Sequence, residues 1–492
     1  MTISKYSFHV LFLVLLVSFS FSYAHFRHIT PKEIDPKSFN SHSSPLSPSL
    51  TSKGSGLLSG SSSSRDSSLF DNLSSSNASG SSKISDSSSV STNSKGFAFS
   101  GSFRGSGLLS ASTNSGASNN KEFNINLKAN LSGCFSKVFA FGDSYTDTGN
   151  ARLIGILKSF VGAVLTGRVS QGGNSNFKLG GRSSNGRMVV DFLCDSLNIP
   201  TPIPYKAISS DFDFDSNSGV NFAVGGATSL SGDFFVNHKI GHTLMWKGIP
   251  LGFQTQIEWF NHFVTRIACK RKTEEECKAE MGKHLIWLGQ MGVDDFARVI
   301  GSSVSMRWLT DITINHISKI LTTLLDSGGK FVVVQGLPPV GCCPLSKLLT
   351  PQSEKDEMGC SLVINRAVMA HNELLQKTLE DFRVRHGTEV TISYADYFNA
   401  YKAIMGNLAG FGFSDGSEAC CGVGGGLLNF NLHNLCGMAG TTACEKPSNH
   451  VHWDGLHLTE AMHKQITRLF LHGGYCKPSF DDIISRQRNS GT

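Results

Sequence analysis

The globular part of this chain lacks an excess of charge of either sign. The 492 residues carry 44 Lys and Arg and 38 Asp and Glu side chains, a net charge of +6. Of these, 11 basic and 6 acidic residues precede position 134, so residues 134–492 hold 33 and 32, a net charge of +1. Nucleic-acid-binding domains concentrate basic residues on one face. We therefore expect no nucleic-acid partner.

Long hydrophobic runs are also missing. The longest strictly apolar stretch, Val10–Val17, is well short of the roughly 18–20 residues that span a bilayer. Lys5 precedes it and Ser22-Tyr23-Ala24 follows it, which is the pattern of a secretory signal peptide cleaved after Ala24. A membrane anchor is the alternative that the short run disfavours. We predict that residues 1–24 are a signal peptide, that no integral membrane segment remains after cleavage, and that the protein is extracellular.

The cysteines lack the C-x-x-C spacing of zinc knuckles, because Cys342-Cys343 and Cys420-Cys421 are adjacent pairs. All 12 lie at or after Cys134, and an even number agrees with an oxidising compartment. Buried free thiols remain an alternative for some of them. The pairs that would close short loops are Cys269–Cys277, Cys342–Cys360 and Cys436–Cys444.

What the chain has in abundance is serine. Residues 41–120 contain 33 serines, too polar and repetitive a composition to form a core. We predict that residues 25–133 are a disordered, low-complexity spacer and that residues 134–492 form one large domain. Asn72, Asn77 and Asn130 begin N-x-Ser sequences and are glycosylation candidates in a secreted protein.

Beyond Cys134, short apolar runs alternate with amphipathic helical patterns. This alternation predicts a parallel sheet between two layers of helices, with ligands bound beyond the carboxyl ends of the strands. The predicted strands are Lys137–Phe141, Leu285–Leu288, Phe331–Val334 and Val390–Tyr394. The predicted helices are Trp308–Leu325 and Leu362–His386.

Ser144 directly follows the first predicted strand in Gly142-Asp143-Ser144. A serine at a strand-to-helix turn is exposed beside backbone N–H groups, which suits a nucleophile whose intermediate is an oxyanion. A helix N-cap is the structural alternative. Near the other end, Asp454 and His457 are three residues apart around a glycine turn, so the carboxylate can orient the imidazole toward a serine. The α/β-hydrolase motif G-x-S-x-G is absent from the sequence.

Two glycine turns lie between these segments. Gly225-Gly226 and the segment Gly292-Val293-Asp294-Asp295 can each present backbone N–H groups without a side chain in the way. An oxyanion site requires such donors, although each segment also fits an ordinary tight turn.

Taken in order, these segments resemble the GDSL esterase/lipase family of SGNH hydrolases, particularly its secreted plant branch. The resemblance rests on FAFGDSYTDTGN, NFAVGGATSL, VVVQGLPPVGCCP and HWDGLHLTEA, with CCGVGGGLLNFN as a further mark. It implies a flavodoxin-like three-layer α/β/α fold, an extracellular location such as the cell wall or apoplast, and a role in lipid metabolism. By motif, Ser144 matches the nucleophile, His457 the general base and acid, and Asp454 its orienting partner. The N–H groups of Ser144 and Gly226 match the oxyanion donors.

The chain departs from the family at one position. Asp294 stands where the family has an asparagine whose amide is the last oxyanion donor. An ionised carboxylate accepts hydrogen bonds only, and it would repel the developing negative charge. Burial and the neighbouring Asp295 could raise the pKa of Asp294 until it stays protonated and donates.

The leading hypothesis is hydrolysis of a small-molecule or lipid ester through an acyl-enzyme, without metal or cofactor. An alcohol in place of water would make the same residues an acyltransferase, and impaired catalysis would leave a secreted binding protein on the same fold. A metallophosphoesterase is a further alternative, and it would bind its metal ions through Asp143, Asp147, Asp294, Asp295, Asp454 and His457. Nothing in the sequence indicates the oligomeric state.

Overall fold

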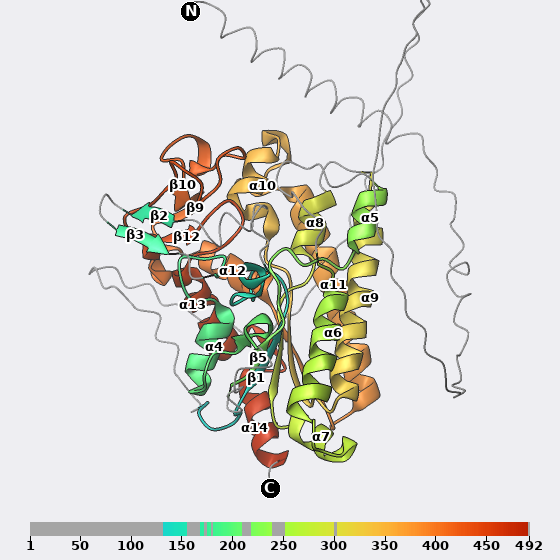
Figure 1. Ribbon diagram of the computed structural model, residues 1–492. Coiled ribbons are helices and arrows are strands. Elements are labelled where there is room, and N and C mark those ends of the chain that lie inside the picture. The colour runs from blue at the N-terminus through green and yellow to red at the C-terminus, as the bar shows by residue number, and fades with distance from the viewer. Residues whose placement is uncertain are drawn as a thin grey trace, which may run out of the picture. The chain divides into compact units, whose positions relative to one another are not determined.

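The computed structural model describes residues 131–154, 168–171, 175–178, 181–208, 218–238, 251–299 and 303–490 (Figure 1). The predicted signal peptide lies outside these residues. So do nearly all of the predicted spacer and the three glycosylation candidates, Asn72, Asn77 and Asn130.

A seven-stranded sheet forms the centre of the domain. Six neighbouring strands run parallel, and β13 pairs antiparallel with β8 at one edge. In spatial order the strands are β13 (Cys476–Lys477), β8 (Thr391–Ala395), β7 (Phe331–Gln335), β6 (Leu285–Leu288), β1 (Val138–Phe141), β5 (Val220–Asn221) and β4 (Ile203–Pro204).

The order of the strands confirms the flavodoxin-like prediction. The chain passes from β1 to β4 and β5 on one side and then crosses to β6, β7 and β8 on the other. The order β5-β1-β6-β7-β8 is the 2-1-3-4-5 arrangement of that fold, and it reverses direction beside β1. Ligands in such sheets bind beyond the carboxyl ends of the strands at this reversal.

Helices cover both faces of the sheet, which gives three layers (Figure 1). Successive side chains of β1 point to opposite faces: Phe139 and Phe141 enter one core, and Val138 and Ala140 enter the other. The first core is packed by α6 (Phe253–Phe263), α8 (Val293–Val299), α9 (Met306–Asp326) and α11 (Leu362–His386). The second is packed by α4 (Val189–Leu197), α12 (Tyr397–Met405), α13 (Glu460–His472) and α14 (Phe480–Ser490). The other α-helices among the described residues are α2 (Asn150–Leu153), α5 (Gly232–Asn237), α7 (Glu274–Met281) and α10 (Pro344–Leu349).

The two predicted long helices are present, and serine caps set their starts. The side chain of Ser361 accepts the N–H of Ile364, so α11 begins at Leu362 as predicted and ends before Gly387. Ser305 caps α9 in the same way, and the helix therefore begins two residues before the predicted Trp308. The predicted strands all form, with ends shifted by at most one residue.

Two small sheets lie outside the central one. The first contains β10 (Cys421–Gly422), β11 (Thr442–Ala443), β2 (Arg168–Gln171) and β3 (Ser175–Lys178), in that order. The second pairs β12 (His450–His452) with β9 (Asp415–Ala419) in parallel. β12 therefore runs beside β9 and leads into Asp454.

Disulfides confirm two predicted pairs, Cys269–Cys277 and Cys342–Cys360. The predicted pair Cys436–Cys444 is wrong, because Cys421 bonds to Cys436 and Cys420 bonds to Cys444. Cys420 lies at the bend between β9 and β10, and Cys421 is the first residue of β10, so the two adjacent cysteines reach different partners. Among the described residues Cys134, Cys194, Cys343 and Cys476 are buried free thiols.

Candidate active site

Three neighbouring parallel strands deliver the candidate residues to one edge of the sheet. β1 pairs in parallel with both β5 and β6. Ser144 follows β1, Gly226 follows β5, and Asp294 follows β6 in the first turn of α8. Since the carboxyl ends of parallel strands meet at the same edge, these segments converge at the point where the strand order reverses.

Ser144, His457 and Asp454 form a continuous chain of hydrogen bonds. The Oγ of Ser144 lies 2.9 Å from Nε2 of His457, and Nδ1 of the same imidazole lies 2.9 Å from Oδ2 of Asp454. All three side chains are buried. In this arrangement Nδ1–H donates to the carboxylate, so that Nε2 is left to accept the hydroxyl proton.

Asp454, the acid of this hydrogen-bond chain, is held in its ionised form. Oδ1 of Asp454 also accepts the backbone N–H groups of Leu456 and His457, both at 2.7 Å. Burial opposes ionisation, but the imidazole of His457, its hydrogen bond and these two N–H groups together hold the pKa of Asp454 below its usual value. A carboxylate in this state fixes the orientation of the imidazole.

Asp147 holds the segment after β1 to the glycine turn after β5. Its carboxylate accepts four backbone N–H groups, those of Gly149, Asn150, Ala151 and Gly225, at 2.6–2.9 Å. The next residue, Gly226, has a φ of +82°, a region that favours glycine. Sequence reasoning placed Asp147 only in the metal alternative and missed this role, although its place in GDSYTDTGN was the available signal.

Asp294 is fully buried at the start of α8. Within the described residues neither carboxyl oxygen has a hydrogen-bond partner. The pKa of Asp294 is raised to about 7: burial is the largest cause, Asp295 raises it further, and the guanidinium of Arg298, the imidazole of His457 and the N–H of Gly226 oppose the rise. The carboxyl group therefore lies within electrostatic reach of both His457 and Gly226.

The other acids of this region bind backbone and amide groups. Asp295 accepts the N–H groups of Ser229 and Leu230, and burial raises its pKa to about 6. Oδ1 of Asp143 accepts the N–H of Tyr145 and the amide of Gln290. Burial raises the pKa of Asp143 well above its usual value, and the charges of Asp294 and Asp295 raise it further. These acids thus hold loops at the edge of the sheet.

A metal site was the alternative role for these acids. Among the described residues, the group of side chains with ligand atoms close enough to share an ion is Cys420, Cys444 and His450. Two of these form a disulfide, so their sulfur atoms are not available as thiolate ligands. The metallophosphoesterase alternative therefore gains no support from the geometry.

Comparison with known proteins identifies the same family that the sequence motifs resemble. The profile of the GDSL-like lipase/acylhydrolase family matches residues 138–470. A GDSL esterase/lipase of Arabidopsis thaliana is 34% identical over 361 residues, which cover 72% of this chain and 90% of the relative. Acetylajmalan esterase 2 of Rauvolfia serpentina is 32% identical over 351 residues, covering 68% and 90%. A second GDSL esterase/lipase of Arabidopsis thaliana is 35% identical over 350 residues, covering 70% and 88%.

The match begins at Val138, the first residue of β1, and ends within α13. It thus includes every segment that delivers a residue to the site. The chain belongs to the GDSL-like lipase/acylhydrolase family and is a carboxylic ester hydrolase.

Proposed function

We propose that this protein is a secreted serine esterase that hydrolyses carboxylic esters through an acyl-enzyme. The observation that carries the proposal is the buried hydrogen-bond chain Asp454–His457–Ser144, with both links at 2.9 Å. It combines an oriented base with a nucleophile placed after the central strand, the arrangement that general-base activation of a serine requires.

The reaction takes two steps. Ser144 Oγ attacks the ester carbonyl carbon while its proton passes to Nε2 of His457. The imidazolium then gives that proton to the alkoxy oxygen as the C–O bond breaks and the alcohol leaves. In the second step water attacks the acyl carbon, His457 takes a proton from it, and the carboxylic acid is released with Ser144 restored. An alcohol in place of water gives transesterification by the same steps.

The developing oxyanion needs donors, which the N–H groups of Ser144 and Gly226 supply. In this proposal Asp294 is the third donor and acts in its protonated form. Its burial supports this role, because burial raises the pKa of Asp294 to about 7 and a neutral carboxyl group carries one O–H. The acid then replaces an amide donor below neutral pH and repels the oxyanion above it.

Secretion is part of the proposal. It rests on the signal-peptide pattern before Ala24 and on the four disulfides in the described residues, since disulfides persist in oxidising compartments. In the part of the chain that the structure describes, no helix has the length and apolar character needed to cross a membrane.

Turnover of p-nitrophenyl esters of increasing acyl length by the secreted protein tests the function. We expect Ser144→Ala to abolish turnover, and Ser485→Ala, an exposed serine on α14, to leave it unchanged. Adding glycerol as an acceptor separates hydrolysis from acyl transfer. Turnover that survives Ser144→Ala contradicts the proposal, and so does a wild-type protein without turnover. If wild type is inactive while Asp294→Asn is active, the natural protein is a binding protein on this fold.

A further inference from the structure

The turn that carries Asp454 and His457 is closed from outside by an aromatic ring. It is a tight turn in which the N–H of Trp453 donates to the carbonyl of His457 at 2.9 Å. Gly455 lies at its centre, and a Cβ there would overlap the ring of Phe430. The ring thus fills the space beside the peptide between the acid and the base, and it is itself buried.

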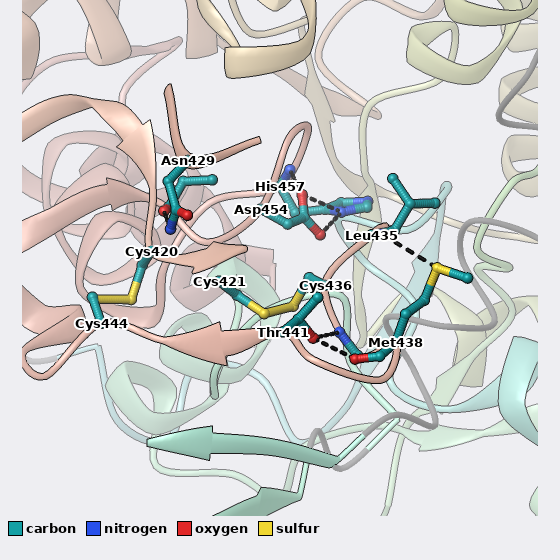
Figure 2. Close-up of a disulfide and its surroundings, with 12 residues drawn as sticks. Cys420, Cys421, Asn429, Leu435, Cys436, Met438, Thr441, Cys444, Asp454 and His457 are labelled. Carbon is teal, nitrogen blue, oxygen red and sulfur yellow. Dashed lines mark hydrogen bonds and ion pairs between the residues drawn. A yellow bond between two sulfur atoms is a disulfide. The ribbon is translucent and has the colours of Figure 1, made fainter. Parts of the chain in front are cut away.

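Phe430 belongs to a glycine-rich loop, residues 422–435, whose two ends are joined by the Cys421–Cys436 disulfide. Asn429, the residue before Phe430, fixes the loop from inside. Its amide donates to the carbonyl of Ala419 at 2.7 Å, and its Oδ1 accepts the N–H groups of Gly424 and Gly425. The position of the ring is therefore set by the closed loop. Figure 2 shows Asn429 and the disulfides Cys421–Cys436 and Cys420–Cys444 together with Asp454 and His457.

Cys421 and the adjacent Cys420 hold the chain on the other side of the turn. The N–H of Cys421 donates to the carbonyl of Trp453 at 2.6 Å, and the N–H of Cys420 donates to that of His452 at 3.0 Å. Trp453 is fully buried in a small separate core with both disulfides. The residue immediately before Asp454 is thus anchored to the disulfide that also closes the loop of Phe430.

We propose that Phe430, held by the Cys421–Cys436 disulfide, is a positioning residue that keeps the Asp454–His457 turn in the geometry that activates Ser144. The inference rests on the proposed function. Its physical reason is that the imidazole must stay within hydrogen-bond reach of the serine, and a displacement of about 1 Å costs on the order of 10²-fold in rate. Phe430 touches the turn and acts through it.

The test compares kcat and KM of Phe430→Ala, Phe430→Leu and wild type, well below their melting temperatures, with an ester that wild type turns over. We expect kcat of Phe430→Ala to fall by about 10- to 100-fold with KM changed less than threefold, and Phe430→Leu to recover most of the loss. The rate of Ser144 labelling by a fluorophosphonate should fall in parallel. Leu427→Ala, on the exposed side of the same loop, is the matched control and should behave as wild type.

The disulfide has its own test, which decides the matter where Phe430→Ala does not fold. We expect Cys421→Ser/Cys436→Ser to lower kcat by a similar factor while circular dichroism stays native. Cys269→Ser/Cys277→Ser, which opens a disulfide after α6, should leave kcat unchanged. Wild-type kcat in Phe430→Ala or in the loop disulfide variant overturns this inference alone. Wild-type turnover that does not depend on Ser144 overturns the proposed function, and this inference with it.

Discussion

Asp147 and Gly225 are joined by a buried hydrogen bond of 2.8 Å between the carboxylate and the backbone N–H. Asp147 lies three residues after Ser144, and Gly225 lies one residue before Gly226. The bond therefore sets the nucleophile segment against the proposed oxyanion turn, across two strands that are neighbours in the sheet but distant in the sequence. Because the same carboxylate accepts three further N–H groups at the start of α2, a change at this residue disturbs both segments.

Asp147→Asn tests this link. Each carboxylate oxygen accepts two N–H groups, and the amide keeps only one oxygen, so two N–H groups lose their partner and face an NH₂ group that is itself a donor. We expect the free energy of unfolding to fall by about 1–3 kcal/mol and kcat to fall more than KM rises. Urea denaturation and ester kinetics measure the two effects. Asp311→Asn, on the exposed side of α9, is the control, and equal behaviour of the two variants would contradict the proposed role.

Asp294 should give the enzyme an alkaline limit that its asparagine variant lacks. Burial raises the pKa of Asp294 to about 7, so in the proposed role the carboxyl group donates to the oxyanion below that pH and becomes a repelling anion above it. We expect wild-type kcat to fall between pH 6 and 8, and Asp294→Asn to stay level there and exceed wild type at pH 8 by about tenfold, because about a tenth of a carboxyl group with this pKa is still protonated at that pH. Wild-type kcat that stays constant from pH 6 to 9 would show that Asp294 is not the donor.

The same residue should make stability depend on pH. A carboxyl group whose pKa is raised by folding, here from 3.8 to about 7, stabilises the folded state below pH 4, and this contribution is lost as the pH rises through about 7. The full difference corresponds to a value on the order of 4 kcal/mol. We therefore expect Asp294→Asn to gain stability relative to wild type at pH 8 compared with pH 4. Urea denaturation at both pH values measures this change. The other buried acids are common to both proteins, so a difference that does not vary with pH would contradict the expectation.

Much of the fold could be predicted from sequence because its central strands are continuous apolar runs. Leu285–Leu288 and Leu362–His386 have the predicted ends, since a buried parallel strand and a capped amphipathic helix each leave a clear local pattern. β4 and β5 have only two residues each, too few for any periodicity to show. The pairing of Cys420 and Cys421 could not be predicted either, because it depends on which way each side chain points in the folded chain.

In the candidate site, too, some residues could be predicted from the sequence and others could not. Ser144, Asp454 and His457 were predicted from motifs, because the chemistry needs those residue types in that order. Phe430 carries no chemistry, and its role follows only from its contact with Gly455, 25 residues further along the chain. Residues that act through packing leave no type-specific signal in a single sequence.

Tyr145 gives a last prediction, because it joins the nucleophile segment to the histidine turn directly. Its hydroxyl donates to the carbonyl of Leu456 at 2.6 Å, and its ring lies 5.5 Å from the imidazole of His457. Tyr145→Phe keeps the ring and removes the hydrogen bond. The thiol of Cys343, at 3.4 Å from the same carbonyl, is a weak donor that replaces only part of it.

For Tyr145→Phe we expect a loss of about 1–2 kcal/mol in the free energy of unfolding and a modest fall in kcat, with KM little changed. Thermal denaturation and ester kinetics measure both. Tyr205→Phe, whose hydroxyl contacts His262 at the surface, is the matched control and should cost less stability and no kcat. If Tyr145→Phe matches that control in both measurements, the hydrogen bond to Leu456 does not hold the histidine turn in place, and the turn depends on Phe430 and the disulfides alone.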